Sequence, residues 1–120
     1  DGLCALGAPV WRYLFSWRPP FLGGRLGASH GIELPFVFGT LRDGWFRTTL
    51  GVSRDARRLS GRMQDAWIAF ARSGAPGHDR LPEWPGYDLT ERATLELDSA
   101  SRVVAAPFAV ESAFWKPRLG

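Results

Sequence analysis

The clearest pattern in the chain is helical and lies between residues 53 and 74. Apolar side chains recur there at spacings of three and four, which places them along one face of a helix. Ser53 is a favourable N-cap, Asp55 suits the first turn, and Gly74 followed by Pro76 is a stop signal. We therefore expect a helix over residues 54–73. Its buried residues should be Leu59, Met63, Trp67 and Phe70, and its solvent-facing residues Arg57, Arg58 and Arg72.

The basic face of this helix raises the question of nucleic-acid binding. The chain has a formal net charge of +3, and its clustered arginines are Arg54, Arg57, Arg58 and Arg62. The other arginines are spread along the chain and are offset by 12 acidic residues. We therefore interpret the cluster as a solvated helix face and expect no nucleic-acid partner.

Two further regions have the composition of strands. Residues 10–17, VWRYLFSW, are rich in aromatic and branched side chains, and two prolines stop them. Apolar groups lie on both faces of this strand, as in a strand covered on two sides. Residues 94–97 alternate apolar and polar positions, residues 98–101 suit a turn, and residues 102–105 are expected to complete a hairpin.

The segments between these elements are less regular. Residues 19–31 form a loop rich in glycine and proline. Residues 33–38 are expected to form a short helix, because Pro35 is tolerated in a first turn. Residues 43–52 are predicted to be a loop, and residues 108–115 a terminal helix.

The order of these elements does not close into a small complete fold. The chain has 120 residues, of which 45% are hydrophobic and 22% charged, so it has a globular composition. Six Trp and eight Phe are a heavy aromatic load that favours a large core. An apolar strand also needs neighbouring layers. We therefore expect an incomplete α/β domain.

Cysteine usage and targeting signals leave the compartment open. Cys4 is the only cysteine, so an internal disulfide and a zinc site with several cysteines are excluded. No apolar run reaches the roughly 18 residues of a membrane span, and no signal peptide is visible. The chain starts with Asp1 and not with Met, from which we expect the true N-terminus to lie elsewhere. No metal site and no cofactor are expected.

The candidate chemistry lies in GASHGIELPFVFG, residues 27–39, where His30 sits among small residues. A catalytic histidine needs a nucleophile and an orienting acid. None of the serines lies in a G-x-S-x-G elbow, and Ser29 is a poor partner because neighbouring side chains in an extended loop diverge. From the residues alone, His30 could be a catalytic base or a structural loop histidine.

Five segments together resemble the C-terminal part of the type-B carboxylesterases, the family of para-nitrobenzyl esterase and the cholinesterases. They are YLFSWRPP, GASHGIELPFVFG, AWIAFARSGAP, LPEWPGYD and RATLELD. The resemblance extends from Tyr13 to Trp115, in the family's order and spacing. It implies that residues 1–120 are the C-terminal portion of an α/β-hydrolase fold, with a central-sheet strand, a catalytic-histidine loop, a long packing helix and a C-terminal hairpin.

The same resemblance implies a serine esterase that acts on a small-molecule carboxylic ester without a cofactor. His30 matches the histidine of the catalytic triad. The nucleophile, the triad acid and the oxyanion-hole glycines would precede Asp1, so the N-terminal part of the same domain would be the chain's partner.

Other residues of the matching segments receive supporting roles. The resemblance makes Glu33 a buried supporting residue that accepts hydrogen bonds, and not the triad acid; Ser29 is assigned to support of His30. His78 lies in a polar loop and is expected to have a surface role. Trp84 and Tyr87 are expected to pack their loop onto the domain.

An alternative reading is a protein without catalysis. Some relatives of this family keep the fold, lose the triad and serve as interaction or adhesion modules. A serine in a G-E-S-A-G-type elbow upstream would separate the two readings. The acyl and alcohol preferences stay open, because missing segments would build most of the acyl pocket.

Overall fold

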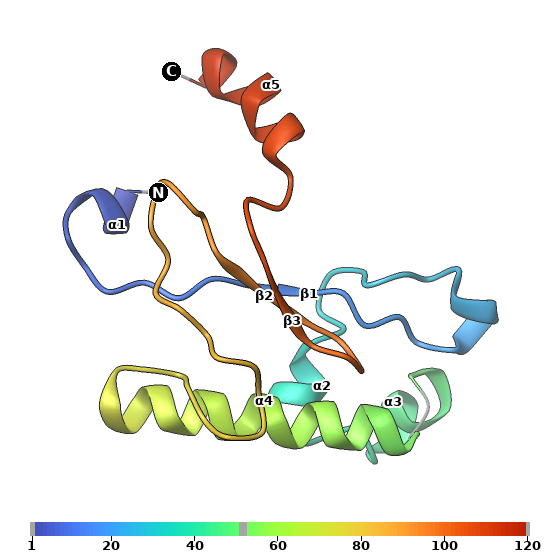
Figure 1. The fold of residues 1–120 in the computed structure, drawn as a ribbon. Coiled ribbons are helices and arrows are strands. Elements are labelled where there is room, and N and C mark those ends of the chain that lie inside the picture. Colours follow the sequence, from blue (N-terminus) through green and yellow to red (C-terminus); the bar gives the residue numbers. More distant parts are fainter. Residues whose placement is uncertain (1, 51–52, 120) are drawn as a thin grey trace.

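The structure is a computed structural model that describes residues 2–50 and 53–119. Asp1 and residues 51 and 52 of the predicted loop therefore lie outside the described residues. A long helix, α4, runs beneath a small sheet, and α5 extends away from the opposite side (Figure 1). The elements in chain order are α1 (Gly2–Ala5), β1 (Tyr13–Phe15), the 3₁₀ turn η1 (Phe21–Gly24), α2 (Leu34–Val37), α3 (Gly44–Thr49), α4 (Arg54–Ser73), β2 (Thr94–Leu97), β3 (Arg102–Val104) and α5 (Ala109–Leu119).

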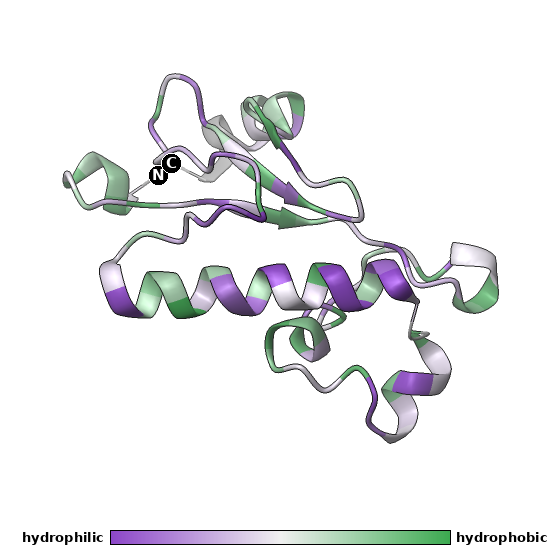
Figure 2. Cartoon of the chain, turned by 60° about the horizontal axis from the view of Figure 1, so that its bottom comes forward, coloured by the Kyte–Doolittle hydropathy of each residue, from purple (hydrophilic) through white to green (hydrophobic). Residues whose placement is uncertain are grey.

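Helix α4 has the predicted bounds, and local signals explain both ends. The Ser53 hydroxyl accepts a hydrogen bond from the Ala56 amide at 3.0 Å, which satisfies one of the free N–H groups of the first turn. Gly74 adopts a left-handed conformation with φ of 76°, and its N–H donates to the Phe70 carbonyl. Figure 2 shows hydrophilic and hydrophobic residues alternating along this helix.

The predicted burial of α4 is correct for Leu59 and Met63 and wrong for Phe70. Leu59 and Met63 are fully buried, whereas Trp67 is half-buried and Phe70 is 50% exposed. Phe70 contacts Trp11 edge-on and lines an apolar cavity, so part of its side chain has no packing partner among the described residues. The arginines expected in solvent, Arg57, Arg58 and Arg72, are all exposed.

The sheet has three strands in the order β1-β2-β3. β1 pairs parallel with β2, with Tyr13 opposite Leu95, and β2 pairs antiparallel with β3. The predicted hairpin is therefore confirmed, although β3 ends at Val104, one residue early. Within the described part of the chain, β1 has a neighbouring strand on one side only.

The first strand is shorter than residues 10–17, because regular pairing needs a partner along its whole length. β2 supplies this partner over three residues only. The extended chain continues on both sides, as Arg12 accepts a hydrogen bond from the Leu95 amide and Ser16 donates to Leu97. The Tyr87 amide donates to the Val10 carbonyl at 2.7 Å, which joins this extended segment to the loop before β2.

The core lies between the sheet and α4, and α2 closes one end of it. Phe36 is completely buried, with its ring 5.1 Å from that of Phe15 and 4.9 Å from that of Trp17. Leu95 and Leu97 of β2 face the same core. The predicted short helix over residues 33–38 is confirmed in the form of α2, which packs on α4.

The prediction of a loop over residues 43–52 is wrong, because Gly44–Thr49 is helical. Two long-range anchors explain the helix: Leu41 and Leu50, which flank it, are both buried in the core. Inside it, the Thr49 hydroxyl donates to the Trp45 carbonyl at 2.7 Å. Burial of flanking residues by distant elements is not visible in a local pattern.

The terminal helix is also longer than predicted. It covers Ala109–Leu119 in place of residues 108–115. Arg92 reaches it from the loop before β2, where its guanidinium donates to the Ser112 hydroxyl at 3.5 Å. Among the described residues, no helix combines the length and the apolar character that a membrane crossing requires.

Candidate functional site

His30 lies in a tight turn between η1 and α2. The Ile32 amide donates to the Ser29 carbonyl at 3.3 Å, so His30 and Gly31 are the two central residues of this turn. Gly31 has φ of 81°, the conformation that a type II turn requires at its third position and that only glycine adopts easily. The turn therefore explains the glycine after the histidine.

The His30 side chain is exposed. Within residues 2–50 and 53–119, its imidazole makes no hydrogen bond or ion pair. A Cβ atom placed on the nearby Gly27 would meet no atom within 4 Å, so space is open on this side of the turn. The small flanking residues thus leave His30 accessible to further groups.

The segment that follows the turn is firmly held. Leu34 donates from its amide to the Gly31 carbonyl at 3.2 Å, which joins the turn to the start of α2. Ile32 is buried, as are Pro35 and Phe36. The exposed His30 is therefore followed directly by a segment whose apolar side chains are buried.

The loop with His30 starts at the carboxyl end of β1, the edge at which open α/β sheets bind ligands. A cavity of about 380 Å³ opens at this edge. It is lined by Ser16, Trp17, Arg18, Pro20, Ser53, Asp55, Asp98 and Ser99. His30 is not among these residues.

Glu33 and Ser29 surround His30 in the sequence but differ in placement. Glu33 is half-buried at the N-cap of α2, and its side chain makes no capping hydrogen bond, so the expected bond to the helix amides is absent. Ser29 is exposed and contributes its backbone carbonyl to the turn. The supporting roles of both side chains stay predictions.

Glu33 does act on one ionisable group across the fold. Burial raises the pKa of the Tyr13 hydroxyl above its usual value, and the negative charge of Glu33 raises this pKa further. The ring of Tyr13 lies edge-on against Trp67 of α4, with ring centroids 5.1 Å apart. The carboxylate next to the His30 turn is therefore electrostatically coupled to β1.

This coupling gives a first prediction. Glu33→Gln should lower the pKa of Tyr13, because the mutation removes the charge that disfavours the phenolate. In NMR titrations with ¹³Cζ-labelled tyrosine, the matched control Glu83→Gln, at an exposed loop position, should leave the Tyr13 pKa unchanged. An unaltered Tyr13 pKa in Glu33→Gln would contradict the coupling.

The sign of the pH effect on stability follows from the raised pKa. The folded state favours the neutral phenol, so the contribution of Tyr13 to stability is complete below its unfolded pKa of about 10. This contribution is lost as the pH rises above that value through the folded pKa.

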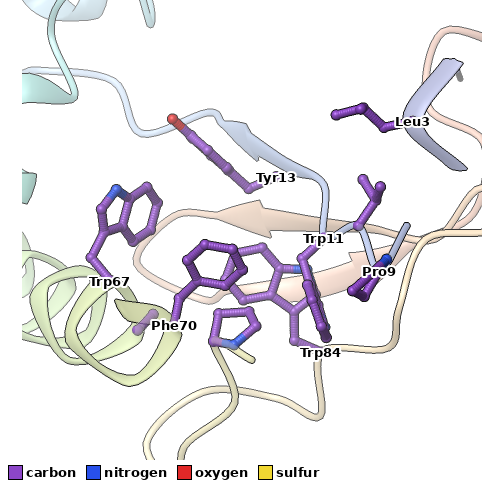
Figure 3. Close-up of a pocket in the computed structure, with 10 residues that line it drawn as sticks. Leu3, Pro9, Trp11, Tyr13, Trp67, Phe70 and Trp84 are labelled. Atoms are coloured by element: carbon purple, nitrogen blue, oxygen red, sulfur yellow. The ribbon is translucent and has the colours of Figure 1, made fainter. Parts of the chain in front are cut away.

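A second cavity, of about 320 Å³, is apolar and lies between β1 and the last turns of α4 (Figure 3). Trp67 and Phe70 line it from α4, and Trp11 and Tyr13 line it from the strand segment. His30 does not line this cavity either. The cavity lies where the segment that leads into β1 passes the carboxyl-terminal turns of α4.

The other histidine has a structural environment. The Nε2 atom of His78 lies 2.9 Å from the Arg62 carbonyl, and its Nδ1 atom accepts a hydrogen bond from the Arg80 amide at 3.2 Å. His78 therefore fastens its loop to α4. The predicted packing of Trp84 and Tyr87 is confirmed, since both are buried and the Trp84 indole donates to the Arg12 carbonyl at 3.1 Å.

The described residues contain no cluster of three or more His, Cys, Asp or Glu side chains placed to bind a metal ion. The thiol of Cys4 donates to the Tyr87 carbonyl at 3.3 Å. Neither observation adds a group to the surroundings of His30.

Sequence reasoning missed one contact near the His30 loop. In the sequence Ser60 is only one of the serines outside a G-x-S-x-G elbow, whereas the structure buries it and directs its hydroxyl to the Phe36 carbonyl of α2 at 2.8 Å. Gln64, one turn later on α4, donates to the Ser60 hydroxyl at 2.9 Å. The only sequence signal was a pair of polar residues on the apolar side of an amphipathic helix.

Comparison with known proteins supplies the context of this partial site. The para-nitrobenzyl esterase of Bacillus subtilis (strain 168) is 43% identical over 96 residues, which cover 77% of this chain and 18% of that protein. The phenmedipham hydrolase of Pseudarthrobacter oxydans is 38% identical over 104 residues, or 84% of this chain and 21% of that protein. The chain thus spans about a fifth of the length of these curated relatives.

Solved structures agree with the sequence matches. A carboxylesterase of Geobacillus stearothermophilus, determined at pH 6.2, superposes with a TM-score of 0.79 and 36% identity over 93% of this chain and 23% of that one. An esterase of Clostridium hathewayi superposes with a TM-score of 0.83 and 26% identity. The mixed sheet with its helices therefore matches part of an α/β-hydrolase fold, and the model of the carboxylesterase family matches residues 2–115. This chain belongs to the carboxylesterase family.

Proposed function

We propose that these residues are the C-terminal part of a serine carboxylesterase in which His30 is the general base. The observation that carries this proposal is the His30 turn. An accessible imidazole stands on a buried apolar segment, in a loop that leaves the carboxyl end of a strand with a parallel partner, inside a region that matches the carboxylesterase family. Open α/β sheets bind their ligands at this edge.

The proposed reaction is hydrolysis of a neutral carboxylic ester. His30 accepts the proton of a serine hydroxyl while the serine oxygen attacks the ester carbonyl carbon. It then gives this proton to the alcohol oxygen as the bond between that oxygen and the acyl carbon breaks. A water molecule repeats the sequence on the acyl-enzyme, releasing the acid and restoring the serine.

The serine, the triad acid and the oxyanion-hole donors are proposed to come from chain that precedes Asp1. The free edge of β1 supports this, because an unpaired edge can accept a further strand. The exposed outer face of Phe70 and the apolar cavity beside it can accept side chains from the same part. The buried Ser16 hydroxyl, at the end of β1, has no partner among the described residues and could also find one there.

The serines of this chain support an external nucleophile. Ser60 is buried and its hydroxyl is bonded to Phe36. Ser53 caps α4, and the Ser73 hydroxyl donates to the Ala69 carbonyl at 2.9 Å. None of these three hydroxyls lies on a strand-to-helix elbow of the kind that exposes the nucleophile of an α/β-hydrolase.

A fluorophosphonate probe, which labels activated serines covalently, tests the proposal. The full-length protein should be labelled at a serine that precedes Asp1, and the 120 residues expressed alone should remain unlabelled. Acyl transfer needs a nucleophile, a base, an orienting acid and oxyanion donors, and among the described residues we propose only the base.

Two outcomes would overturn the proposal. Stoichiometric labelling of a serine within the 120 residues would identify a different nucleophile. A folded full-length protein that takes up no label and hydrolyses no ester would favour the catalytically inactive interaction module. Mass spectrometry of the digested protein locates the labelled serine or shows that no peptide carries the label.

A further inference from the structure

The carboxyl end of α2 is held by side chains of α4. Helix α2 ends at Val37, so the carbonyl of Phe36 has no partner further along the helix. The hydroxyl of Ser60, which is 4% exposed, donates to this carbonyl at 2.8 Å. A buried carbonyl without a partner would be costly, so the contact with Ser60 stabilises α2 in this position.

Gln64 extends the contact. Its amide nitrogen donates to the Ser60 hydroxyl at 2.9 Å and lies 3.4 Å from the Phe36 carbonyl. The same side chain lies against Gly39, where an added Cβ atom would come within 3.1 Å of the Gln64 amide oxygen. Gly39 also has φ of 70°, a conformation that favours glycine, and an added side chain would displace the Gln64 amide as well.

We call this group, formed by Ser60 and Gln64 on α4 with Phe36 and Gly39 at the end of α2, the α2 clamp. The clamp is connected to His30 through the backbone. α2 starts at Leu34, whose amide is bonded to Gly31, the residue directly after His30. The rigid helix α4 therefore determines where the His30 turn lies.

We infer that Ser60 and Gln64 are positioning residues for His30. They fix the position of the loop, and thereby keep the His30 imidazole within hydrogen-bonding reach of the serine and the ester. This inference rests on the proposed function. Displacing a catalytic group by about 1 Å can cost on the order of 100-fold in rate, so a buried contact remote from the substrate can control turnover.

The inference predicts a selective defect. A displaced His30 delivers a proton poorly to the leaving alcohol. An alkoxide is a poor leaving group and depends on that proton, whereas nitrophenolate leaves with little help. Loss of the clamp should therefore impair alkyl esters more than nitrophenyl esters of the same acid. A smaller folded fraction would lower both rates equally.

The test compares Ser60→Ala with Ser73→Ala in the full-length protein. Both mutations remove a serine hydroxyl that is bonded to a carbonyl of the protein, but Ser73 is exposed at the far end of α4. Ser60→Ala should lower kcat/KM for an alkyl ester, which covers the steps up to formation of the acyl-enzyme, by about 10- to 100-fold. Its loss with the nitrophenyl ester should be several-fold smaller, and Ser73→Ala should behave as wild type.

A second variant and a second measurement keep the inference falsifiable. Gln64→Met keeps the length of the side chain and removes the amide, so it should give the same selectivity in weaker form. Hydrogen exchange of the Ile32 and Leu34 amides should accelerate in Ser60→Ala and not in Ser73→Ala. Equal losses for both ester types, or unchanged exchange at these amides, would overturn the inference. A wild-type protein without ester turnover would overturn only the proposed function, because the exchange measurement would still decide whether the clamp holds the turn.

Discussion

His30→Ala is expected to lower the kcat of the full-length protein for an ester by about 10⁴-fold or more, the loss that follows removal of a triad member from a serine hydrolase. The imidazole is the only group of this chain proposed to move a proton in the reaction. Because His30 is exposed and makes no hydrogen bond or ion pair among the described residues, its truncation should cost little packing. Steady-state kinetics with an ester, together with a thermal unfolding curve, measure both effects.

The structure provides a matched control in the other histidine. His78→Ala removes one hydrogen bond to α4 and one within its own loop, so it should lower stability and leave kcat nearly unchanged. Glu33→Gln should likewise reduce kcat far less than His30→Ala. Near-normal turnover in a folded His30→Ala protein would end the catalytic assignment, and a Glu33→Gln protein as inactive as a serine knockout would show that Glu33 is the triad acid.

Phe36→Ala is expected to have the largest effect on stability, a loss of about 3–5 kcal/mol. Phe36 is completely buried, and its ring contacts those of Phe15 and Trp17, so its truncation leaves a cavity between β1 and α2. Urea unfolding followed by tryptophan fluorescence would report the loss, because Trp17 lies at the site of the cavity.

Phe38→Ala is the control for this prediction. Phe38 is two residues further along the same segment and is 73% exposed, so its truncation should change stability by less than about 0.5 kcal/mol. Equal destabilisation by the two mutations would mean that the outer face of α2 is covered in the full-length protein. The core position assigned to Phe36 would be wrong only if Phe36→Ala were itself neutral.

The elements that the sequence predicted correctly are those whose signals lie within the element. α4 carries its own N-cap, apolar stripe and terminal glycine, and the hairpin carries its own alternation and turn. The turn around His30 depends on one glycine at positive φ, directly beside the histidine. Each of these features follows from interactions between residues that are close in the sequence.

The errors arose where distant residues decide the conformation. Residues 44–49 form a helix because their flanking leucines are buried, and β1 is short because β2 pairs with only three of its residues. Phe70 lies on the apolar face of α4, but it contacts Trp11, which precedes β1, and no strand of the described residues covers it. In these cases the local pattern was compatible with several outcomes, and packing selected one.

The candidate site divides in the same way. The sequence by itself determined that His30 stands in a loop bounded by glycines and followed by an apolar segment, because this depends on neighbouring residue types alone. Only the tertiary structure decided that Ser60 holds the Phe36 carbonyl, since the two residues are 24 positions apart and meet only when α2 packs on α4. It also decided that Glu33 influences Tyr13, a residue of β1, because electrostatic coupling depends on distance in space and not on separation along the chain.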